Sequence, residues 1–149
     1  MIALGADHGG YLLKEEIKKH LNEKGIEYKD FGTYSTDSVD YAKIAYKTCA
    51  AVISGECEKA ILCCGTGIGI SIAANKVKGI RAACCSDWFS AKYTRLHNDA
   101  NALCLGGRVV GAGLALEMVD VFLSTEFEGG RHQRRIDQIT AIENGTFKE

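Results

Sequence analysis

The sequence contains no proline and no run of about 18 apolar residues that could cross a membrane. Its N-terminus lacks the basic segment and long apolar stretch of a secretory signal. The formal net charge is −1, with acidic and basic side chains interspersed, so bulk charge does not indicate a nucleic-acid partner. We therefore expect a cytoplasmic protein with no membrane or nucleic-acid partner, in which a small anionic ligand would need only a local basic cluster.

The seven cysteines include no CxxC pair, and their odd number argues against a disulfide framework. This cysteine usage is typical of a reducing compartment. Cys63 and Cys64 are adjacent in an apolar run, and neighbouring residues of a strand point to opposite faces. The two thiols are thus poorly placed to bind one ion, and we expect neither a metal nor a cofactor.

Short apolar runs alternate with amphipathic segments along the whole chain. We expect strands over Ile2–Gly5, Glu27–Phe31, Ala60–Cys64, Ile80–Cys84 and Ala102–Leu105. Leu13, Ile17 and Leu21 have the spacing of one helix face, and Gly25 would end this first helix. A second and a third helix are expected over Tyr41–Ile53 and Ile68–Lys76. A fourth would be capped by Ser86 or Asp87 and run through Lys92 and Arg95, a fifth is expected over Gly111–Leu123, and a last one begins near Gly130. This alternation predicts one α/β domain over residues 1–149. Its fold would be a three-layer α/β/α, Rossmann-like architecture with a five-stranded parallel sheet and a C-terminal helix.

Cys64 ends the third expected strand and is followed by a loop that contains Gly65, Gly67 and Gly69. Backbone N–H groups and the start of a helix favour a thiolate and bind anions, so a reactive sulfur and an oxyanion site would be neighbours. The simpler interpretation is that the glycines only form a tight turn and that Cys64 is a small buried apolar residue.

Polar side chains follow several of the expected strands. Asp7 and His8 follow the first strand, Cys64 and Thr66 the third, and Arg108 the fifth. Ligands of parallel α/β proteins bind outside the carboxyl ends of the strands, so we expect these side chains to share one edge. His97 and Asn98 would join them if the end of the fourth helix also reaches this edge.

Each of these residues also has an ordinary structural explanation. Asp7 could simply cap the following helix, and His8 and His97 could be surface histidines. Arg131 and Arg135 lie four residues apart, which on a helix more often forms a solvated basic face than a phosphate site. The set indicates a function more strongly than any single member does.

The chain resembles the type B ribose-5-phosphate isomerases, a family that also contains the subunits of galactose-6-phosphate isomerase. The resemblance covers nearly the whole chain and rests on the motifs Gly5-Ala-Asp-His-Gly-Gly10, Asp40-Tyr41, Cys64-Gly-Thr-Gly-Ile-Gly-Ile-Ser-Ile-Ala-Ala-Asn-Lys76, Gly79-Ile-Arg-Ala82, Arg95-Leu-His-Asn-Asp99, Gly106-Gly-Arg-Val-Val-Gly111 and Gly129-Gly-Arg-His-Gln-Arg-Arg135. It implies a metal-independent isomerase that interconverts ribose 5-phosphate and ribulose 5-phosphate in the pentose phosphate pathway through an enediolate.

The resemblance also implies roles for individual residues. Cys64 would be the general base, His97 would help to open the furanose ring, and Thr66 would assist ring opening or orient the substrate. The residues expected to contact the sugar are Asp7, His8, Tyr41, Asn98 and the loop of Gly65, Gly67, Ile68 and Gly69. The residues expected to hold the phosphate are Arg108, Arg131 and Arg135. Family members are dimers or dimers of dimers with shared sites, so we expect His97, Asn98 and Arg108 to face the Cys64 loop of another chain.

Two positions separate this chain from other members of the family. Members without the cysteine have glycine there and a glutamate six residues later, where this chain has Ile70. Isoleucine cannot accept a proton, so the chain falls in the cysteine branch and depends on Cys64. Ala42 replaces the proline that commonly follows the Asp-Tyr pair, which affects only the local loop.

Three alternatives remain at this point. A hexose 6-phosphate, from allose or galactose, would undergo the same chemistry. A sugar-phosphate binding protein without catalysis would have no need of Cys64 and His97. A nucleotide-binding module would use Gly9-Gly10 and Asp30, but the spacing is not GxGxxG and Asp7 would repel a pyrophosphate.

Overall fold

A computed structural model describes residues 1–149 and shows a five-stranded, entirely parallel sheet in the order β2-β1-β3-β5-β4. The strands are β1 (Ile2–Ala6), β2 (Tyr28–Asp30), β3 (Lys59–Cys64), β4 (Ala82–Cys84) and β5 (Ala102–Gly106). The helices are α1 (Tyr11–Glu23), α2 (Tyr41–Ile53), α3 (Ile68–Ala74), α4 (Trp88–Asn98), α5 (Ala112–Ser124) and α6 (Arg131–Glu143). The chain order reverses between β1 and β3, the place where α/β sheets open a ligand crevice.

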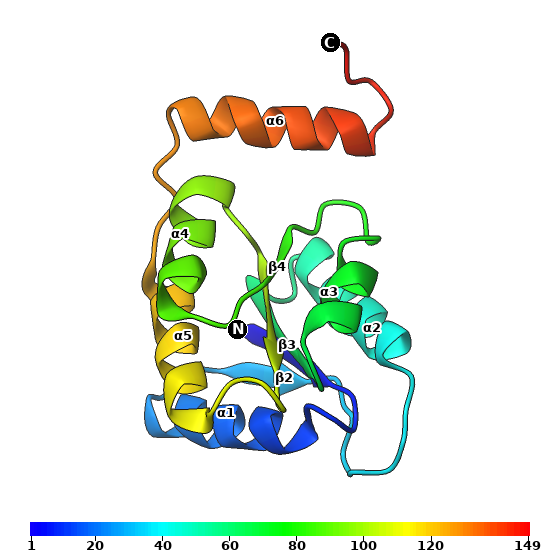
Figure 1. Ribbon diagram of the computed structural model, residues 1–149, viewed down its shortest axis with the longest axis vertical. Helices are drawn as coiled ribbons and strands as arrows, with labels where there is room; N and C mark the ends of the chain where they lie inside the picture. Colours follow the sequence, from blue (N-terminus) through cyan, green and yellow to red (C-terminus); the bar gives the residue numbers. More distant parts are fainter.

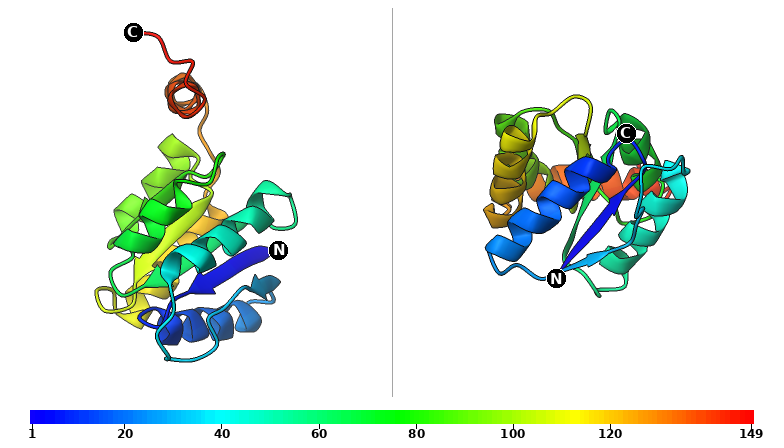
Figure 2. Two further views of the ribbon diagram at one scale, coloured as in Figure 1. Left: turned by 90° about the vertical axis from the view of Figure 1, so that its right-hand side faces the viewer. Right: turned by 90° about the horizontal axis from the view of Figure 1, so that it is seen from below.

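Helices cover both faces of this sheet, as Figures 1 and 2 show. Along β3, Ile61 and Cys63 pack in a core with α1, α4 and α5. Leu62 and Cys64 pack on the opposite face with α2 and α3. Successive side chains of a strand point to opposite faces, which divides the β3 residues between the two cores. Both faces are covered by helices, so every β3 residue from Ala60 onward is buried. The expected three-layer α/β/α fold is thus confirmed, including the opposite orientation of the adjacent cysteines.

The fourth strand is shorter than expected. It begins at Ala82 instead of Ile80, because the Arg81 N–H donates to Asn101 Oδ1 at 2.8 Å, a side-chain oxygen, instead of to a neighbouring strand. The helix after it has the expected cap, since Asp87 Oδ1 accepts the Ser90 N–H at 2.7 Å. Other expected boundaries differ by one or two residues.

The C-terminal helix α6 lies across the amino ends of the strands, outside the layers (Figure 1). The left view of Figure 2 shows it end-on, at one end of the molecule. Its side chains Ile139 and Ile142 are exposed, whereas Ile136 is buried. None of the six helices is both long and apolar enough to cross a membrane.

Candidate active site

The turn after β1 is held by the Asp7 side chain. Asp7 Oδ1 accepts hydrogen bonds from the N–H groups of Gly9 at 2.8 Å and Gly10 at 3.1 Å. The N-cap of α1 is Gly10, which has no side-chain cap, so Asp7 does not cap the helix. The residue is buried, and the position of its carboxylate is set by these two amides.

Cys64 ends β3, and its sulfur lies inside the glycine loop. The Gly67 N–H donates to Cys64 Sγ at 3.0 Å, so a backbone hydrogen bond fixes the position of the sulfur at the strand end. Gly67 has a left-handed φ of 79°, which is costly for other residues and is required for this turn. The Thr66 hydroxyl accepts the Ile68 N–H at 3.2 Å, so Thr66 and Cys64 both lie on the same short loop.

The other buried cysteines are in less favourable surroundings for a thiolate. Burial raises the pKa of Cys63 well above its usual range, and it raises the pKa of Cys49 to about 12 and of Cys85 to about 11. These thiols are therefore neutral packing groups at ordinary pH.

Three loops meet at the carboxyl edge with their backbones in contact. The Gly107 N–H donates to the Cys64 carbonyl at 2.8 Å, and the Arg108 N–H donates to the Gly65 carbonyl at 3.0 Å. A Cβ on Gly10 would overlap the Cys63 carbonyl, and one on Gly107 would lie 2.6 Å from the Gly9 oxygen. The loops after β1, β3 and β5 therefore form one tightly packed unit.

A cavity of about 530 Å³ opens beside this unit. It is lined by Asp7, His8, Ser38, Val39, Asp40, Tyr41, Ala42 and Lys43. The Val39 N–H donates to His8 Nδ1 at 3.2 Å, so a neutral His8 carries its proton on Nε2. The Tyr41 ring packs on the start of α3, where a Cβ on Gly69 would come within 2.9 Å of it.

The structure thus brings many of the expected site residues to one edge of one chain. They are Asp7, His8, Tyr41, Cys64, Gly65, Thr66, Gly67, Ile68, Gly69 and Arg108. The Arg108 guanidinium lies 3.3 Å from the position of a Cβ on Gly65. Arg108 therefore lies on the Cys64 loop of its own chain, which differs from the expectation that it would face another chain.

The remaining expected residues lie at the opposite edge of the sheet. A helix that follows a parallel strand runs back along it, so His97 and Asn98, at the end of α4, reach the amino ends of the strands. Arg131 and Arg135 lie on α6 near His132, whose ring stacks on His97. The condition for His97 and Asn98 to join the Cys64 edge of their own chain is therefore not met, and the expectation that they face the Cys64 loop of another chain stays a prediction.

His97 forms part of a cluster with two residues that the sequence did not single out. Its ring stacks on His132, with centroids 4.1 Å apart and planes within 12°. Ligand atoms of His97, Glu128 and His132 lie within 4.8 Å of one another. A metal ion would need both imidazole lone pairs to converge, but lone pairs in two nearly parallel planes run side by side. The stacked arrangement does not fit a metal.

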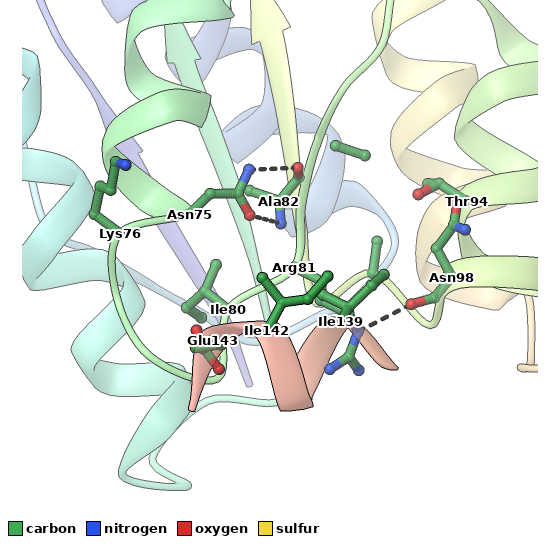
Figure 3. Close-up of a pocket in the computed structure, with 12 residues that line it drawn as sticks. Asn75, Lys76, Ile80, Arg81, Ala82, Thr94, Asn98, Ile139, Ile142 and Glu143 are labelled. Atoms are coloured by element: carbon green, nitrogen blue, oxygen red, sulfur yellow. Dashed lines mark hydrogen bonds between the residues drawn. The ribbon is translucent and has the colours of Figure 1, made fainter. Parts of the chain in front are cut away.

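A cavity of about 620 Å³ also lies at the amino edge (Figure 3). Ile139 and Ile142 of α6 line one side of it, and Ile80 and Asn98 line the body. It lies at the other end of the sheet from Cys64, so its size does not make it the candidate active site.

A buried lysine near the Cys64 edge was also missed. Lys14 of α1 is 1% exposed, and its Nζ donates to both Asp30 oxygens, at 2.6 and 2.7 Å, and to the Thr33 carbonyl at 2.7 Å. Its position next to Leu13 on the apolar helix face is the one signal in the sequence. Only the tertiary structure shows that it anchors the segment leading to Val39 and Tyr41.

Comparison with known proteins places these features in a family. A family model described as Ribose/Galactose Isomerase matches residues 2–139. The chain is 54% identical over 142 residues to ribose-5-phosphate isomerase B of Escherichia coli K12, covering 95% of each protein.

Solved structures agree with this comparison. A structure of ribose-5-phosphate isomerase B from Clostridium thermocellum is 55% identical, with a TM-score of 0.95 and 97% of both chains covered. The enzyme from Mycoplasma genitalium with bound ribulose-5-phosphate is 41% identical, with a TM-score of 0.91 and coverage of 96% of this chain and 95% of that one.

Proposed function

Because this chain belongs to the ribose/galactose isomerase family, we propose that it interconverts D-ribose 5-phosphate and D-ribulose 5-phosphate. The observation that carries the proposal is the Cys64 sulfur, which accepts a hydrogen bond from the Gly67 N–H in a loop that packs on the β1 turn. Asp7 and His8 of that turn line a cavity together with Tyr41. The bound ribulose-5-phosphate of the Mycoplasma genitalium relative supports a pentose phosphate as the ligand.

Cys64 acts as the general base. Aldose–ketose isomerisation moves a proton between two adjacent carbons, and the carbon acid is weak. The Cys64 thiolate removes the proton from C2 of the open-chain aldose, and the resulting thiol returns a proton to C1 of the enediolate. General base catalysis of this kind contributes about two to four decades in rate.

The glycine loop stabilises the charge that develops on the substrate oxygens. The Gly67 N–H lies next to the sulfur, and a single N–H donor to an oxyanion is worth about 2.7–4 kcal/mol. Asp7, His8 and Tyr41 contact the sugar, and Thr66 orients it. Arg108 supplies a positive charge from the same edge.

The site is completed by a second copy of the chain. His97, Asn98, Arg131 and Arg135 lie at the amino edge, too far around the sheet to reach Cys64 of their own chain. In a homodimer, or a dimer of dimers, they meet the partner's Cys64 loop, where His97 assists ring opening and the arginines bind phosphate. No metal ion or cofactor takes part.

The substrate is the second question, because an allose or galactose 6-phosphate would undergo the same chemistry. This one sequence carries all the candidate residues, so identical copies are enough to form the site. This favours the pentose over galactose 6-phosphate, whose isomerase has two different subunits. The volume of the cavity lined by Asp7, His8 and Tyr41, about 530 Å³, does not distinguish the two sugars, so they are compared directly in the assay.

The test is conversion of ribose 5-phosphate to ribulose 5-phosphate by the purified protein in excess chelator, with allose 6-phosphate in parallel. Cys64→Ala is expected to lower kcat by about two to four decades. Cys63→Ala is the matched control, because the adjacent Cys63 is equally buried but faces the opposite core and should keep near-normal kcat.

Three other results would each contradict one part of the proposal. An inactive wild type on the pentose with turnover of the hexose changes the substrate. Loss of activity in chelator contradicts metal independence. A Cys64→Ala variant that stays active means that Cys64 is not the base.

A further inference from the structure

The His97 cluster contains the one buried side-chain polar atom of the chain that lacks a hydrogen-bond partner. This atom is Nε2 of His132, whose side chain is only 5% exposed. The nearest opposite charge is Glu128 Oε2, at 3.4 Å from His132 Nε2 and 3.9 Å from His97 Nε2. One carboxylate oxygen therefore lies beside both imidazoles.

Glu128 is held in this place by the backbone. Its N–H donates to the Leu96 carbonyl at 3.1 Å, which attaches the segment between α5 and α6 to the last turn of α4. Leu96 is the residue before His97, so the attachment fixes Glu128 directly beside the imidazole. The Tyr93 ring contacts the edge of His97, with centroids 5.1 Å apart, and His132 covers its face.

The charges in the cluster distinguish the two histidines. Burial, followed by the neighbouring His97 and the Arg131 and Arg135 guanidiniums, lowers the pKa of His132, while Glu128 opposes this. His132 is therefore neutral near pH 7. The His97 ring stacks on it at 4.1 Å, where two positive charges would repel, and His97 is the more exposed of the two side chains, at 37%.

We propose that Glu128 is a positioning residue that orients the His97 ring for proton donation, with the His132 ring stacked on its face. The proposal rests on the proposed function, in which His97 assists ring opening. In that step the C1–O4 bond of the furanose breaks, its electron pair goes to O4, and O4 takes a proton from His97. The anomeric hydroxyl releases its proton to water as the C1 carbonyl forms. His97 then regains a proton from solvent.

The experiment separates ring opening from the proton transfer at carbon. Ribulose 5-phosphate has no free hydroxyl that can close a five-membered ring onto its carbonyl, so it reaches the Cys64 base in open form. Exchange of its C1 hydrogen in D2O, followed by NMR, reports the base alone. Net isomerisation of ribose 5-phosphate also requires ring opening. Both rates are measured for wild type, Glu128→Gln, His97→Ala and the control Glu126→Gln, an exposed glutamate two residues away.

Glu128→Gln is expected to lower ribose 5-phosphate isomerisation about ten- to a hundredfold and to leave C1 exchange within about twofold of wild type, as His97→Ala does. Glu126→Gln should change neither rate. Normal isomerisation by Glu128→Gln overturns the proposal, and so does an equal loss of both rates, which would indicate a structural role. If His97→Ala isomerises ribose 5-phosphate at the wild-type rate, His97 is not the acid of ring opening and the proposal is overturned. A wild type without isomerase activity on ribose 5-phosphate is instead a failure of the proposed function.

Discussion

At the scale of single residues, the carboxyl edge depends on glycines that allow three loops to pack backbone against backbone. A side chain on Gly10 has no space, because its Cβ would overlap the Cys63 carbonyl, and backbone cannot move aside cheaply. Gly113, near the start of α5, has nothing within 4 Å of its Cβ position. The same substitution should therefore have opposite effects at the two positions.

Gly10→Ala is expected to lower the free energy of unfolding by at least about 1–3 kcal/mol, because it overpacks a site that cannot relax. Gly113→Ala should raise it by up to about 1 kcal/mol, since alanine favours a helix over glycine. Urea denaturation of both variants checks the pair. A Gly10→Ala variant as stable as wild type would contradict the packing of the β1 loop on β3.

At the scale of elements, α1 anchors the irregular segment that connects β2 to α2. Lys14 binds Asp30 and the Thr33 carbonyl, and Lys18 also contacts Asp30, at 2.9 Å. Burial opposes the charged form of Asp30, but hydrogen bonds from Lys14, the Gly32 N–H and Lys18 outweigh it and hold its pKa below the usual value. A carboxylate with a lowered pKa in the folded state stabilises the fold above the unfolded pKa, and this stabilisation is lost as the pH falls through the folded value.

Asp30→Asn is therefore expected to lower the free energy of unfolding by about 2–4 kcal/mol at pH 7, because it leaves Lys14 buried without its counter-ion. The difference from wild type should narrow below about pH 4, as Asp30 becomes protonated in the wild type. Urea denaturation between pH 3 and pH 7 measures both effects. Asp37→Asn is the control, since Asp37 is exposed and makes no ion pair. A difference independent of pH would show that the ion pair is not its source.

At the scale of the whole molecule, the residues of the proposed site lie in two groups at opposite edges of the sheet. The Cys64 loop lies at the carboxyl ends of the strands, and His97 and Arg131 lie at the amino ends. Exposed apolar side chains on α6, Ile139 and Ile142, border the cavity at the amino edge (Figure 3). In the proposed function, a second copy of the chain brings the two groups together.

Subunit mixing tests this arrangement. Cys64→Ala and His97→Ala homo-oligomers should each be nearly inactive, but co-refolded one to one they should recover about a quarter of wild-type activity. Half of random dimers are then hybrids, and each hybrid has one intact site of two. Mixed Cys64→Ala and Asp7→Ala chains are the control and should recover nothing, because Cys64 and Asp7 lie at the same edge of one chain. An active monomer, or no recovery in the first mixture, would contradict the shared site.

Much of the fold was predictable because it depends on local patterns. The spacing of apolar residues predicted all five strands and six helices, and the capping residues and glycines predicted their ends to within a few residues. The site was predictable only in part. The residues directly after β1, β3 and β5 met as expected, since parallel strands end at one edge. His97 did not, because the sequence does not say whether the end of a returning helix reaches the same edge.

The sequence by itself determined the alternation of strands and helices, the position of Cys64 at a strand end and the glycines that let its loop turn back on the sulfur. These features arise from contacts between residues close together in the chain. Tertiary structure alone decided the strand order, the burial of Lys14 beside Asp30 and the stacking of His97 on His132 next to Glu128. Those contacts join residues far apart in sequence, and they depend on how the whole sheet and its helices pack, which no local pattern encodes.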